Sequence, residues 1–310
     1  MPFVILTKSP QTGLLDRERI GSFYRRLFNV SRGPQAVTSS LVRGLSEIGF
    51  EFTVNPRSGK LFENAPVFVN ESIAALKWGI GAKKAGLIKQ LIAGPNLVVL
   101  PTEKEAVLSA PEIDLILQPS DWVRDLYISL NPALAGKIRV WPAGVELPPE
   151  SGAKKRDLVL IFNKLPPAAR LPEKISGFLR KLDVKYEQID YGRFGRGDYF
   201  KALDSARVMI YLSDSESQGI ALAEAWARNV PTLVYNRGYM EYNGFKWYDK
   251  KISAPYLSAY TGLFFGGADD FETRFSDFWN NLSVYTPRQY VSDNLTDKIC
   301  AQKFLELVKL

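Results

Sequence analysis

Two carboxylates that lie eight residues apart, Glu216 and Glu224, give the clearest chemical signal in the sequence. A short apolar run, Val208–Leu212, comes first, and a polar turn at 213–219 contains the first of the two glutamates. An amphipathic helix is expected roughly from Gln218 to Arg228, and it contains the second glutamate. The segment therefore predicts a strand, a loop and a helix that place one carboxylate in the loop and one on the helix.

The start of this helix is suited to an anion. Free backbone N–H groups and the positive end of the helix dipole favour a phosphate at a helix N-terminus. Glu216 would lie beside that anion, and Glu224 lies one turn beyond Ile220 on the same helix face. The layout predicts a nucleotide-sugar site, with the sugar at Glu216, the diphosphate at the helix tip and the ribose at Glu224.

The spacing alone is weak support, because a second pair of glutamates, Glu63 and Glu71, has the same separation without a comparable glycine turn. With 17 glutamates in 310 residues, roughly one such pair is expected by chance. The alternative interpretation of Glu216 and Glu224 is a solvated loop and a solvated helix face. The flanking strands and the Ser217–Gly219 turn favour the functional interpretation.

The sequence has no histidine and one cysteine, Cys300, which excludes several kinds of chemistry. There can be no Ser–His or Cys–His nucleophile pair, no histidine base and no histidine metal ligand. A single cysteine also excludes an internal disulfide and suits a reducing cytoplasm. Any chemistry must therefore rely on carboxylates, Lys or Arg, hydroxyls, backbone groups or the substrate itself.

The net charge of +7 comes from the first third of the chain. Residues 1–102 hold 13 Lys and Arg against 6 Asp and Glu, whereas residues 103–310 hold 27 of each. This basic part indicates an acidic acceptor, an anionic membrane surface, nucleic acid or a merely solvated basic surface. Nucleic acid is the weakest of these, because no recognised reading module is present.

Two further patterns bear on membranes. Residues 74–89 mix lysines with Trp78 and aliphatic residues at helical spacing, which fits either an interfacial helix or a core-facing helix. No apolar run approaches the roughly 20 residues of a membrane span, and the N-terminus is expected to be a buried strand, not a signal peptide. We expect a cytoplasmic protein, with peripheral membrane association left open.

Short apolar runs alternate with helical patterns in both halves of the chain, which predicts two α/β domains with parallel sheets. The expected strands are 3–6, 52–54, 67–69, 97–100, 114–117 and 138–141 in the first half, then 157–162, 186–191, 208–212 and 232–235. Helices are expected at 36–48 and 122–130, and residues 147–156 as a linker. The predicted domains are 1–148 and 149–290, followed by a closing C-terminal helix at 291–310.

Ligands of open parallel sheets bind at the carboxyl ends of the strands, where the strand order reverses. In the second half these ends are Asn163-Lys164, Tyr191-Gly192 and the 213–219 turn. In the first half the matching loop is 31–35, which contains Gly33 ahead of the expected helix.

The run 215–227 resembles the Glu-x7-Glu signature of retaining GT-B glycosyltransferases of the glycosyltransferase family 4 type. Residues 139–146 resemble the family's strand that ends in Pro-x-Gly-Val-Asp/Glu, and residues 118–123 resemble its Ser-x-Trp helix start. Gly33 falls where the family has its glycine-rich first loop. The resemblance covers most of the chain, and only the Glu-x7-Glu block is specific by itself.

The resemblance implies an α/β fold of two facing Rossmann-like domains with a cleft between them, in which the first domain takes the acceptor and the second the donor. Carried over by position, Glu216 would bind the donor sugar near its reacting carbon, Glu224 the ribose and Lys164 the phosphates. The residues that it implies for donor binding are Ser217, Gln218, Gly219, Ile220, Glu224, Tyr191, Gly192 and Gly33, and the catalytic residues are Glu216 and Lys164.

The implied activity is transfer of a sugar, with retention, from a nucleotide-diphosphate sugar to a hydroxyl of a sugar, glycan or lipid-linked acceptor. No metal or cofactor is implied, because Lys164 and the helix N-terminus would neutralise the leaving phosphate. Two alternatives stay open, a catalytically silent nucleotide-sugar-binding protein and a nucleotide-sugar 2-epimerase of the same fold.

The sequence departs from the family at two places. The family's Gly-Arg and Lys-Gly pairing after the first C-terminal strand is replaced by Asn163-Lys164, so that Arg170 or Lys174 would have to supply a second cation. Asn229 replaces the glycine after the signature helix, and asparagine also adopts the left-handed conformation that ends helices.

Overall fold

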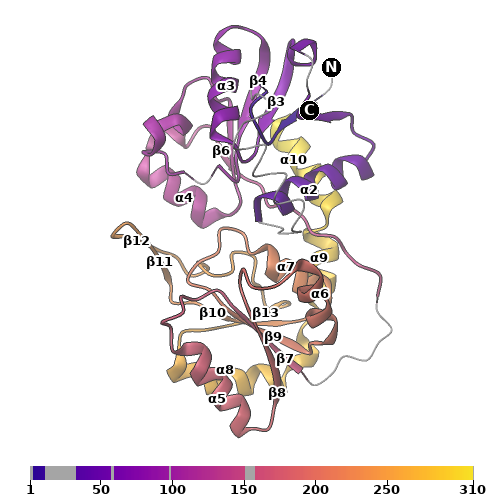
Figure 1. The fold of residues 1–310 in the computed structure, drawn as a ribbon, viewed down its shortest axis with the longest axis vertical. Coiled ribbons are helices and arrows are strands. Elements are labelled where there is room, and N and C mark those ends of the chain that lie inside the picture. Colours follow the sequence, from indigo (N-terminus) through magenta and orange to yellow (C-terminus); the bar gives the residue numbers. More distant parts are fainter. Residues whose placement is uncertain (1–2, 11–32, 57–58, 98, 151–157, 310) are drawn as a thin grey trace. The chain divides into compact units, whose positions relative to one another are not determined.

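The computed structural model describes residues 3–10, 33–56, 59–97, 99–150 and 158–309. These residues form two compact units, one of Met1–Gly144 with Asp297–Leu310 and one of Val145–Thr296 (Figure 1). Each unit contains a parallel β-sheet with helices. The predicted α/β architecture of two Rossmann-like domains is confirmed.

The first unit is built on a six-stranded sheet. Its strands, in spatial order, are β2 (Phe52–Val54), β1 (Phe3–Leu6), β3 (Ala65–Val69), β4 (Ile88–Ala93), β5 (Leu115–Gln118) and β6 (Ile138–Val140). The helices are α2 (Gly33–Glu47), α3 (Ile73–Lys84), α4 (Asp121–Leu130) and α10 (Asp297–Val308), with short 3-10 turns η1 (Gly59–Phe62), η2 (Lys104–Ser109) and η3 (Pro132–Leu134). The strand order reverses between β1 and β3.

The predicted strand at 97–100 is wrong, because the fourth strand is β4, which begins within the predicted helical segment 74–89. Gly86, in the left-handed region at φ 70°, follows helix α3 and lets the chain turn into β4. Gly94, at φ 103°, directly follows the strand, and a Cβ there would lie 2.1 Å from the Leu117 carbonyl oxygen. The chain therefore leaves the sheet before residue 97.

Helix α3 packs on its own sheet. Its buried residues Leu76 and Gly79 face the core, and a Cβ on Gly79 would lie 2.7 Å from a methyl group of Leu91. On the outer side, the ammonium group of Lys83 pairs with Asp114 at 2.9 Å. The segment therefore has the burial expected of the core-facing alternative.

The last helix belongs to the first unit. The Phe304 ring contacts Phe3, Phe68 and Trp141 at centroid distances of 5.6, 5.1 and 5.1 Å. The predicted single helix at the C-terminus is two helices, because α9 (Pro287–Asn294) ends two residues before α10 begins. The division of the chain thus falls after Gly144 and after Thr296.

The second unit is built on a five-stranded sheet. Its strands, in spatial order, are β13 (Gly262–Phe265), β10 (Thr232–Tyr235), β9 (Val208–Leu212), β7 (Leu158–Asn163) and β8 (Lys185–Asp190). Its helices are α5 (Leu171–Lys181), α6 (Arg196–Ser205), α7 (Ile220–Ala227), α8 (Ala268–Asn280) and α9, with the 3-10 turn η4 (Leu282–Val284). Apolar side chains from β7, β9 and β10 pack against α5 and α8.

Two β-structures of the second unit were not predicted from the sequence, strand β13 and an antiparallel hairpin of β11 (Tyr239–Tyr242) and β12 (Phe245–Tyr248), and α5, α6 and α8 had no predicted ranges. Most of the predicted linker, residues 151–156, lies outside the described residues.

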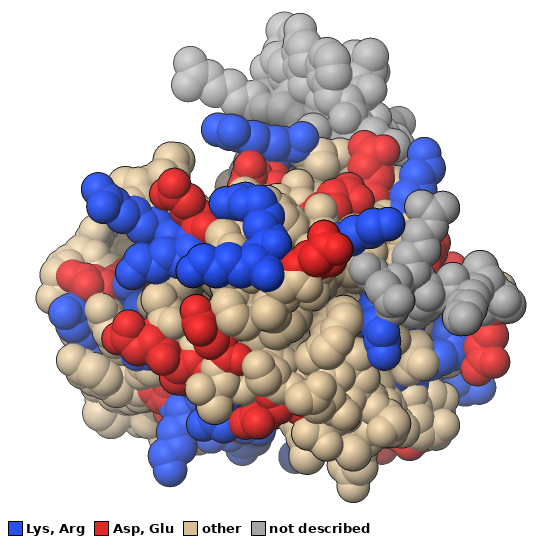
Figure 2. All heavy atoms as spheres, turned by 90° about the horizontal axis from the view of Figure 1, so that it is seen from below, with Lys and Arg blue, Asp and Glu red and all other residues tan. Residues whose placement is uncertain are grey.

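The surface of the second unit carries charges of both signs. In the view from below, blue Lys and Arg side chains and red Asp and Glu side chains are interspersed at the end where α5 and α8 lie (Figure 2). Within the part of the chain that is described, no helix is both long and apolar enough to cross a membrane.

Candidate donor site

The site lies where the strand order of the second sheet reverses. Strand β7 pairs with β8 on one side and with β9 on the other. Lys164 directly follows β7, and its backbone N–H donates to the Leu212 carbonyl at the end of β9 over 2.7 Å. Loops that leave adjacent strands at such a reversal frame a ligand site. The predicted residues Lys164 and Glu216 are on these two loops.

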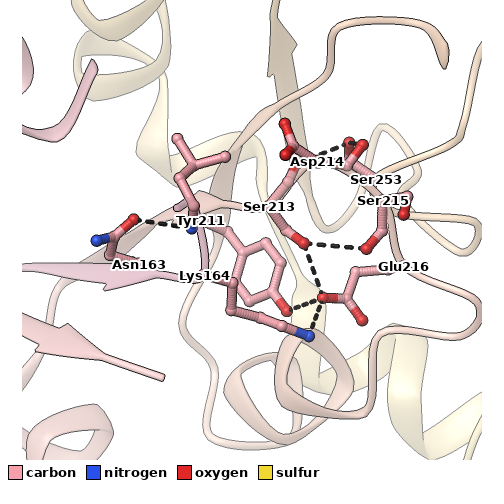
Figure 3. A network of polar contacts seen from close by, with 9 residues as sticks. Asn163, Lys164, Tyr211, Ser213, Asp214, Ser215, Glu216 and Ser253 are labelled. Carbon is pink, nitrogen blue, oxygen red and sulfur yellow. Dashed lines mark hydrogen bonds and ion pairs between the residues drawn. The ribbon is translucent and has the colours of Figure 1, made fainter. Parts of the chain in front are cut away.

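Glu216 is the centre of a polar network (Figure 3). Its Oε1 atom forms an ion pair with the ammonium group of Lys164. The same oxygen accepts hydrogen bonds from the Tyr211 hydroxyl at 2.7 Å and from Ser213 Oγ at 3.0 Å. The Glu216 side chain is only 11% exposed, so the solvated-loop interpretation does not describe it.

Tyr211 supports Glu216 from the core of the sheet. Its ring stacks on Phe162 at 5.2 Å with 9° between the planes. Burial raises the pKa of the Tyr211 hydroxyl well above its usual value, and the negative charge of Glu216 adds to the increase. The hydroxyl therefore keeps its proton and acts as a fixed hydrogen-bond donor to the carboxylate.

The loop that contains Glu216 is also held through its backbone. The Glu216 N–H donates to the Ile252 carbonyl at 2.8 Å, and Ser253 Oγ donates to the Ser213 carbonyl at 3.1 Å. Arg237 pairs with Asp214 at 3.3 Å. A segment that follows the β11–β12 hairpin thus braces the loop, a support that the sequence did not reveal.

Helix α7 begins at Ile220, two residues later than predicted, because Gly219 lies in the left-handed region at φ 83° and forms the N-cap. Gln218 and Gly219 are buried and Ser217 is exposed. The first turn of α7 contains no acidic residue, so the positive end of its dipole is not offset there.

Glu224, on α7, is 8% exposed. Its Oε1 accepts a hydrogen bond from Arg196 Nη2, the first residue of α6, at 2.6 Å. The Arg196 guanidinium lies 5.0 Å from the centre of the Phe200 ring, and that of Arg228 lies 3.8 Å from it. Glu224 is therefore a buried, charge-paired carboxylate and not part of a solvated helix face.

The predicted pair after β8 reaches the same network. Tyr191 is 56% exposed, and the Lys164 ammonium lies 4.6 Å from its ring centre. Gly192 adopts φ 83°, which favours glycine. Beside them, a hydrogen bond from Asn163 at 2.9 Å and a second from Gln188 lower the pKa of the Asp190 carboxyl.

Other candidates lie elsewhere. Gly33 is the first residue of α2 in the first unit, and the loop residues 31 and 32 before it are outside the described residues. Arg170 precedes α5, and Lys174 lies on the side of α5 that forms a groove with α8. Glu63 and Glu71, which repeat the eight-residue spacing, flank strand β3 at its two ends.

Sequence reasoning missed Arg196, Tyr211 and Ser213. Tyr211 lies in an apolar run that is typical of a core strand, and Arg196 lies 28 residues before its partner Glu224. Of these three residues, only Ser213 had a signal in the sequence, because it directly follows β9 and the carboxyl ends of parallel strands form ligand sites.

No model of a protein family matches the sequence, and no curated protein is similar to it. Solved structures are similar in fold. A variant of TarM from S. aureus, in complex with fondaparinux, α-GlcNAc-glycerol and UDP, is 12% identical, with a TM-score of 0.53 over 81% of this chain and 57% of that chain. The chain thus spans a little over half the length of TarM.

Two other structures match over nearly their whole length. The lipopolysaccharide outer core galactosyltransferase WaaB is 11% identical, with a TM-score of 0.60 over 100% of both chains. HepE from Anabaena, in complex with UDP and glucose, is 11% identical, with a TM-score of 0.60 over 100% of this chain and 99% of that chain. The chain has the GT-B fold. At this level of identity the likeness shows the fold and not the activity.

Proposed function

We propose that the protein is a retaining glycosyltransferase that uses a nucleotide-diphosphate sugar as donor. The observation that carries this proposal is the pairing of Lys164 with Glu216 at the strand-order reversal of the second sheet. A helix N-terminus and the buried carboxylate Glu224 follow within eight residues along the chain. A cation, an anion-binding helix end and two carboxylates are the groups that a sugar diphosphate needs.

The donor would lie along the loop and helix. Backbone N–H groups at Ser217, Gln218, Gly219 and Ile220 would bind the diphosphate together with Lys164. Glu224 would accept hydrogen bonds from the ribose, and the backbone at Tyr191 and Gly192 would meet the base. UDP complexes of TarM and HepE, which share the fold, support a nucleotide ligand.

In the proposed reaction the bond between the anomeric carbon and the β-phosphate oxygen breaks, and the acceptor oxygen bonds to that carbon on the same face. The β-phosphate oxygen takes the acceptor proton, so no enzyme base is required. Glu216 would stabilise the positive charge that develops on the sugar ring, and Lys164 the negative charge on the leaving phosphate. This route uses no metal or cofactor and fits a chain without histidine.

The first unit would bind the acceptor, a hydroxyl of a sugar, glycan or lipid-linked molecule. Its excess of basic residues would suit an acidic acceptor or an anionic membrane surface. We expect the reaction in the cytoplasm, where reduced thiols persist. Burial raises the pKa of the Cys300 thiol to about 12, so this thiol is unreactive at neutral pH.

A donor panel tests the proposal. The full chain is incubated separately with UDP-glucose, UDP-galactose, UDP-N-acetylglucosamine and GDP-mannose, and the thermal shift and the slow release of nucleoside diphosphate are measured. Glu216→Gln and Lys164→Ala should each reduce release by about 100-fold or more, the scale of losing one preorganised electrostatic group. Glu63 is exposed and belongs to the other pair of glutamates that lie eight residues apart. Glu63→Gln should therefore leave the release of nucleoside diphosphate unchanged.

The outcomes separate the open alternatives. A thermal shift without release, with or without an acceptor extract, would indicate a silent nucleotide-sugar-binding protein. Conversion of one nucleotide sugar into its C2 epimer would indicate an epimerase. Unchanged release in both site variants would reject the assignment of Glu216 and Lys164.

A further inference from the structure

The β11–β12 hairpin is an aromatic extension of the second unit, and in Figure 1 it extends away from the five-stranded sheet. Its turn residues Asn243 and Gly244 have φ of 48° and 77°. Positive φ at both positions is typical of the tight turn that matches the twist of two paired strands. The hairpin is therefore a defined element and not an irregular loop.

The strand register divides the hairpin into two faces. Residues opposite each other in an antiparallel pair share a face. One face carries four nonpolar or aromatic side chains, Met240, Tyr242, Phe245 and Trp247. The other face carries two aromatic and two charged side chains, Tyr239, Glu241, Lys246 and Tyr248.

Three of these rings are open to solvent. Tyr242 is 45% exposed, Phe245 is 39% exposed and Tyr248 is 69% exposed. Tyr239, in contrast, lies next to the guanidinium of Arg237 at 4.4 Å and the ammonium of Lys246 at 4.9 Å. Exposed aromatic residues that cluster on one element indicate a binding surface, whereas exposed apolar residues scattered singly are common on any protein.

The hairpin is connected directly to the candidate donor site. At its base, Arg237 pairs with Asp214 of the loop that contains Glu216. The chain that leaves the hairpin supplies the Ile252 carbonyl to the Glu216 N–H and the Ser253 hydroxyl to the Ser213 carbonyl. The base of the hairpin is therefore joined to the loop that contains Glu216.

The side chains on the hairpin fit a carbohydrate. A sugar ring presents weakly positive C–H groups on its faces, which suit the negative face of an aromatic ring, and hydroxyls around its edge, which suit charged and amide groups. Glu241 and Lys246, which lie 3.8 Å apart on the face that carries Tyr248, provide an acceptor and a donor on that face.

We propose that the β11–β12 hairpin binds the carbohydrate chain of the acceptor by stacking sugar rings on Tyr242 and Phe245 of one face and on Tyr248 of the other. This inference rests on the proposed function and names the acceptor as a glycan long enough to reach the hairpin while its terminal hydroxyl meets the donor. The first unit would bind the reacting end of the acceptor, the hairpin would bind a more distant part of its chain, and Glu216 and Lys164 would act on the donor.

Direct glycan binding tests the inference without using the donor. The labelled full chain is applied to an array of bacterial and eukaryotic oligosaccharides and polysaccharides in the absence of nucleotide. Two variants, Tyr248→Ala and the double change Tyr242→Val with Phe245→Val, remove rings from opposite faces. Valine keeps a strand-forming residue at the turn. Tyr260→Ala, which removes a ring that is 60% exposed outside the hairpin, is the matched control.

The wild-type protein and Tyr260→Ala should bind the same glycans, and each hairpin variant should bind them at least tenfold more weakly with unchanged donor-induced thermal shifts. Absence of glycan binding by the wild-type protein, or equal binding by all variants, would overturn the inference. So would hairpin-dependent sedimentation with vesicles of phosphatidylcholine and phosphatidylserine in place of glycan binding. Because donor shifts are read separately, failure of the hairpin role and failure of the proposed transfer remain distinguishable.

Discussion

The two units share a sheet topology and differ in the chemistry at the carboxyl ends of their strands. In the first unit, Asn55 Nδ2 donates to Thr7 Oγ1 at 2.9 Å, and Asn70 Nδ2 donates to Thr38 Oγ1 at 2.7 Å. These contacts join amides to hydroxyls close to the reversal between β1 and β3. Thr38 Oγ1 in turn donates to Glu71 Oε1 at 3.4 Å. At the corresponding place in the second unit, ammonium and guanidinium groups pair with the carboxylates of Glu216 and Glu224.

Under the proposed function, this difference would let one fold serve two tasks. Amide and hydroxyl groups can exchange hydrogen bonds with the hydroxyls of an acceptor, whereas a diphosphate is best bound by positive charge and a helix end. The ion pairs Lys164–Glu216 and Arg196–Glu224 also offset part of the cost of placing the two carboxylates in a largely buried setting. Function is carried by these side chains and not by the shared topology.

The largest expected effect is on the free energy of unfolding, and it distinguishes the two units through one core variant in each. Phe304→Ala, in the core of the first unit, and Phe275→Ala, in the core of the second, each delete a buried ring and should lower the free energy of unfolding by about 3–5 kcal/mol. In scanning calorimetry, Phe275→Ala should lower the temperature at which the second unit unfolds. UDP should raise the temperature of that same transition, because a ligand stabilises the folded unit that binds it. The comparison fails if UDP instead raises the transition lowered by Phe304→Ala.

A smaller effect separates two carboxylates. Glu224→Gln would weaken the proposed hydrogen bonds to the ribose and would leave Arg196 without its charged partner, so the affinity for UDP should fall by about 10- to 100-fold, or about 1.5–3 kcal/mol. Glu71→Gln, in the first unit, should leave the affinity for UDP unchanged. Isothermal titration calorimetry measures both, and equal losses in the two variants would contradict the assignment of the ribose to the second unit.

Tyr211→Phe tests how much the hydrogen bond from Tyr211 to Glu216 contributes to turnover of the donor. Loss of one hydrogen bond to the carboxylate should cost about 1–1.5 kcal/mol, or about 5- to 10-fold in donor turnover. Because the pKa of Tyr211 is raised well above its usual value, the wild-type hydroxyl stays protonated and the size of the effect should be constant between pH 6 and pH 9. An effect that disappears at alkaline pH would show that the hydroxyl ionises in this range.

The smallest effect concerns Asp190, whose pKa is lowered by Asn163. A carboxyl with a lower pKa in the folded state stabilises the fold above its unfolded pKa of about 4, and this stabilisation is lost as the pH falls through the folded value. Because Asp190 lies near the surface, Asp190→Asn should cost only a few tenths of a kcal/mol, about 0.3–0.5, at pH 7. Urea unfolding should show no difference near pH 2, and a difference that persists there would contradict this origin.

Much of the second unit could be predicted, because its central strands are continuous apolar runs between polar turns. The predicted ranges of β9 and β10 match the structure. The first unit was harder, because Gly86 ends a helix only two residues before β4, and a window of helical spacing covered both. The β11–β12 hairpin was missed because aromatic residues lie on both of its faces, so that its two short strands do not alternate as a half-buried strand does.

In the candidate site, too, local sequence patterns predict some of the residues and not those that tertiary packing brings together. Glu216, Glu224 and Lys164 could be found from the turns after strands, since neighbouring strand ends meet at one sheet edge. Arg196 could not, because its contact with Glu224 depends on how α6 packs beside α7, which no local pattern encodes. Nor could the brace from Ile252 and Ser253, which is set by backbone contacts.

The most direct test of the account is a crystal structure of the full chain with UDP. The account predicts the diphosphate at the N-terminus of α7, with a phosphate oxygen near Lys164 and a ribose hydroxyl within about 2.7–3.2 Å of Glu224. Ordered UDP at the edge of the first sheet, with the Lys164–Glu216 pair untouched, would contradict it.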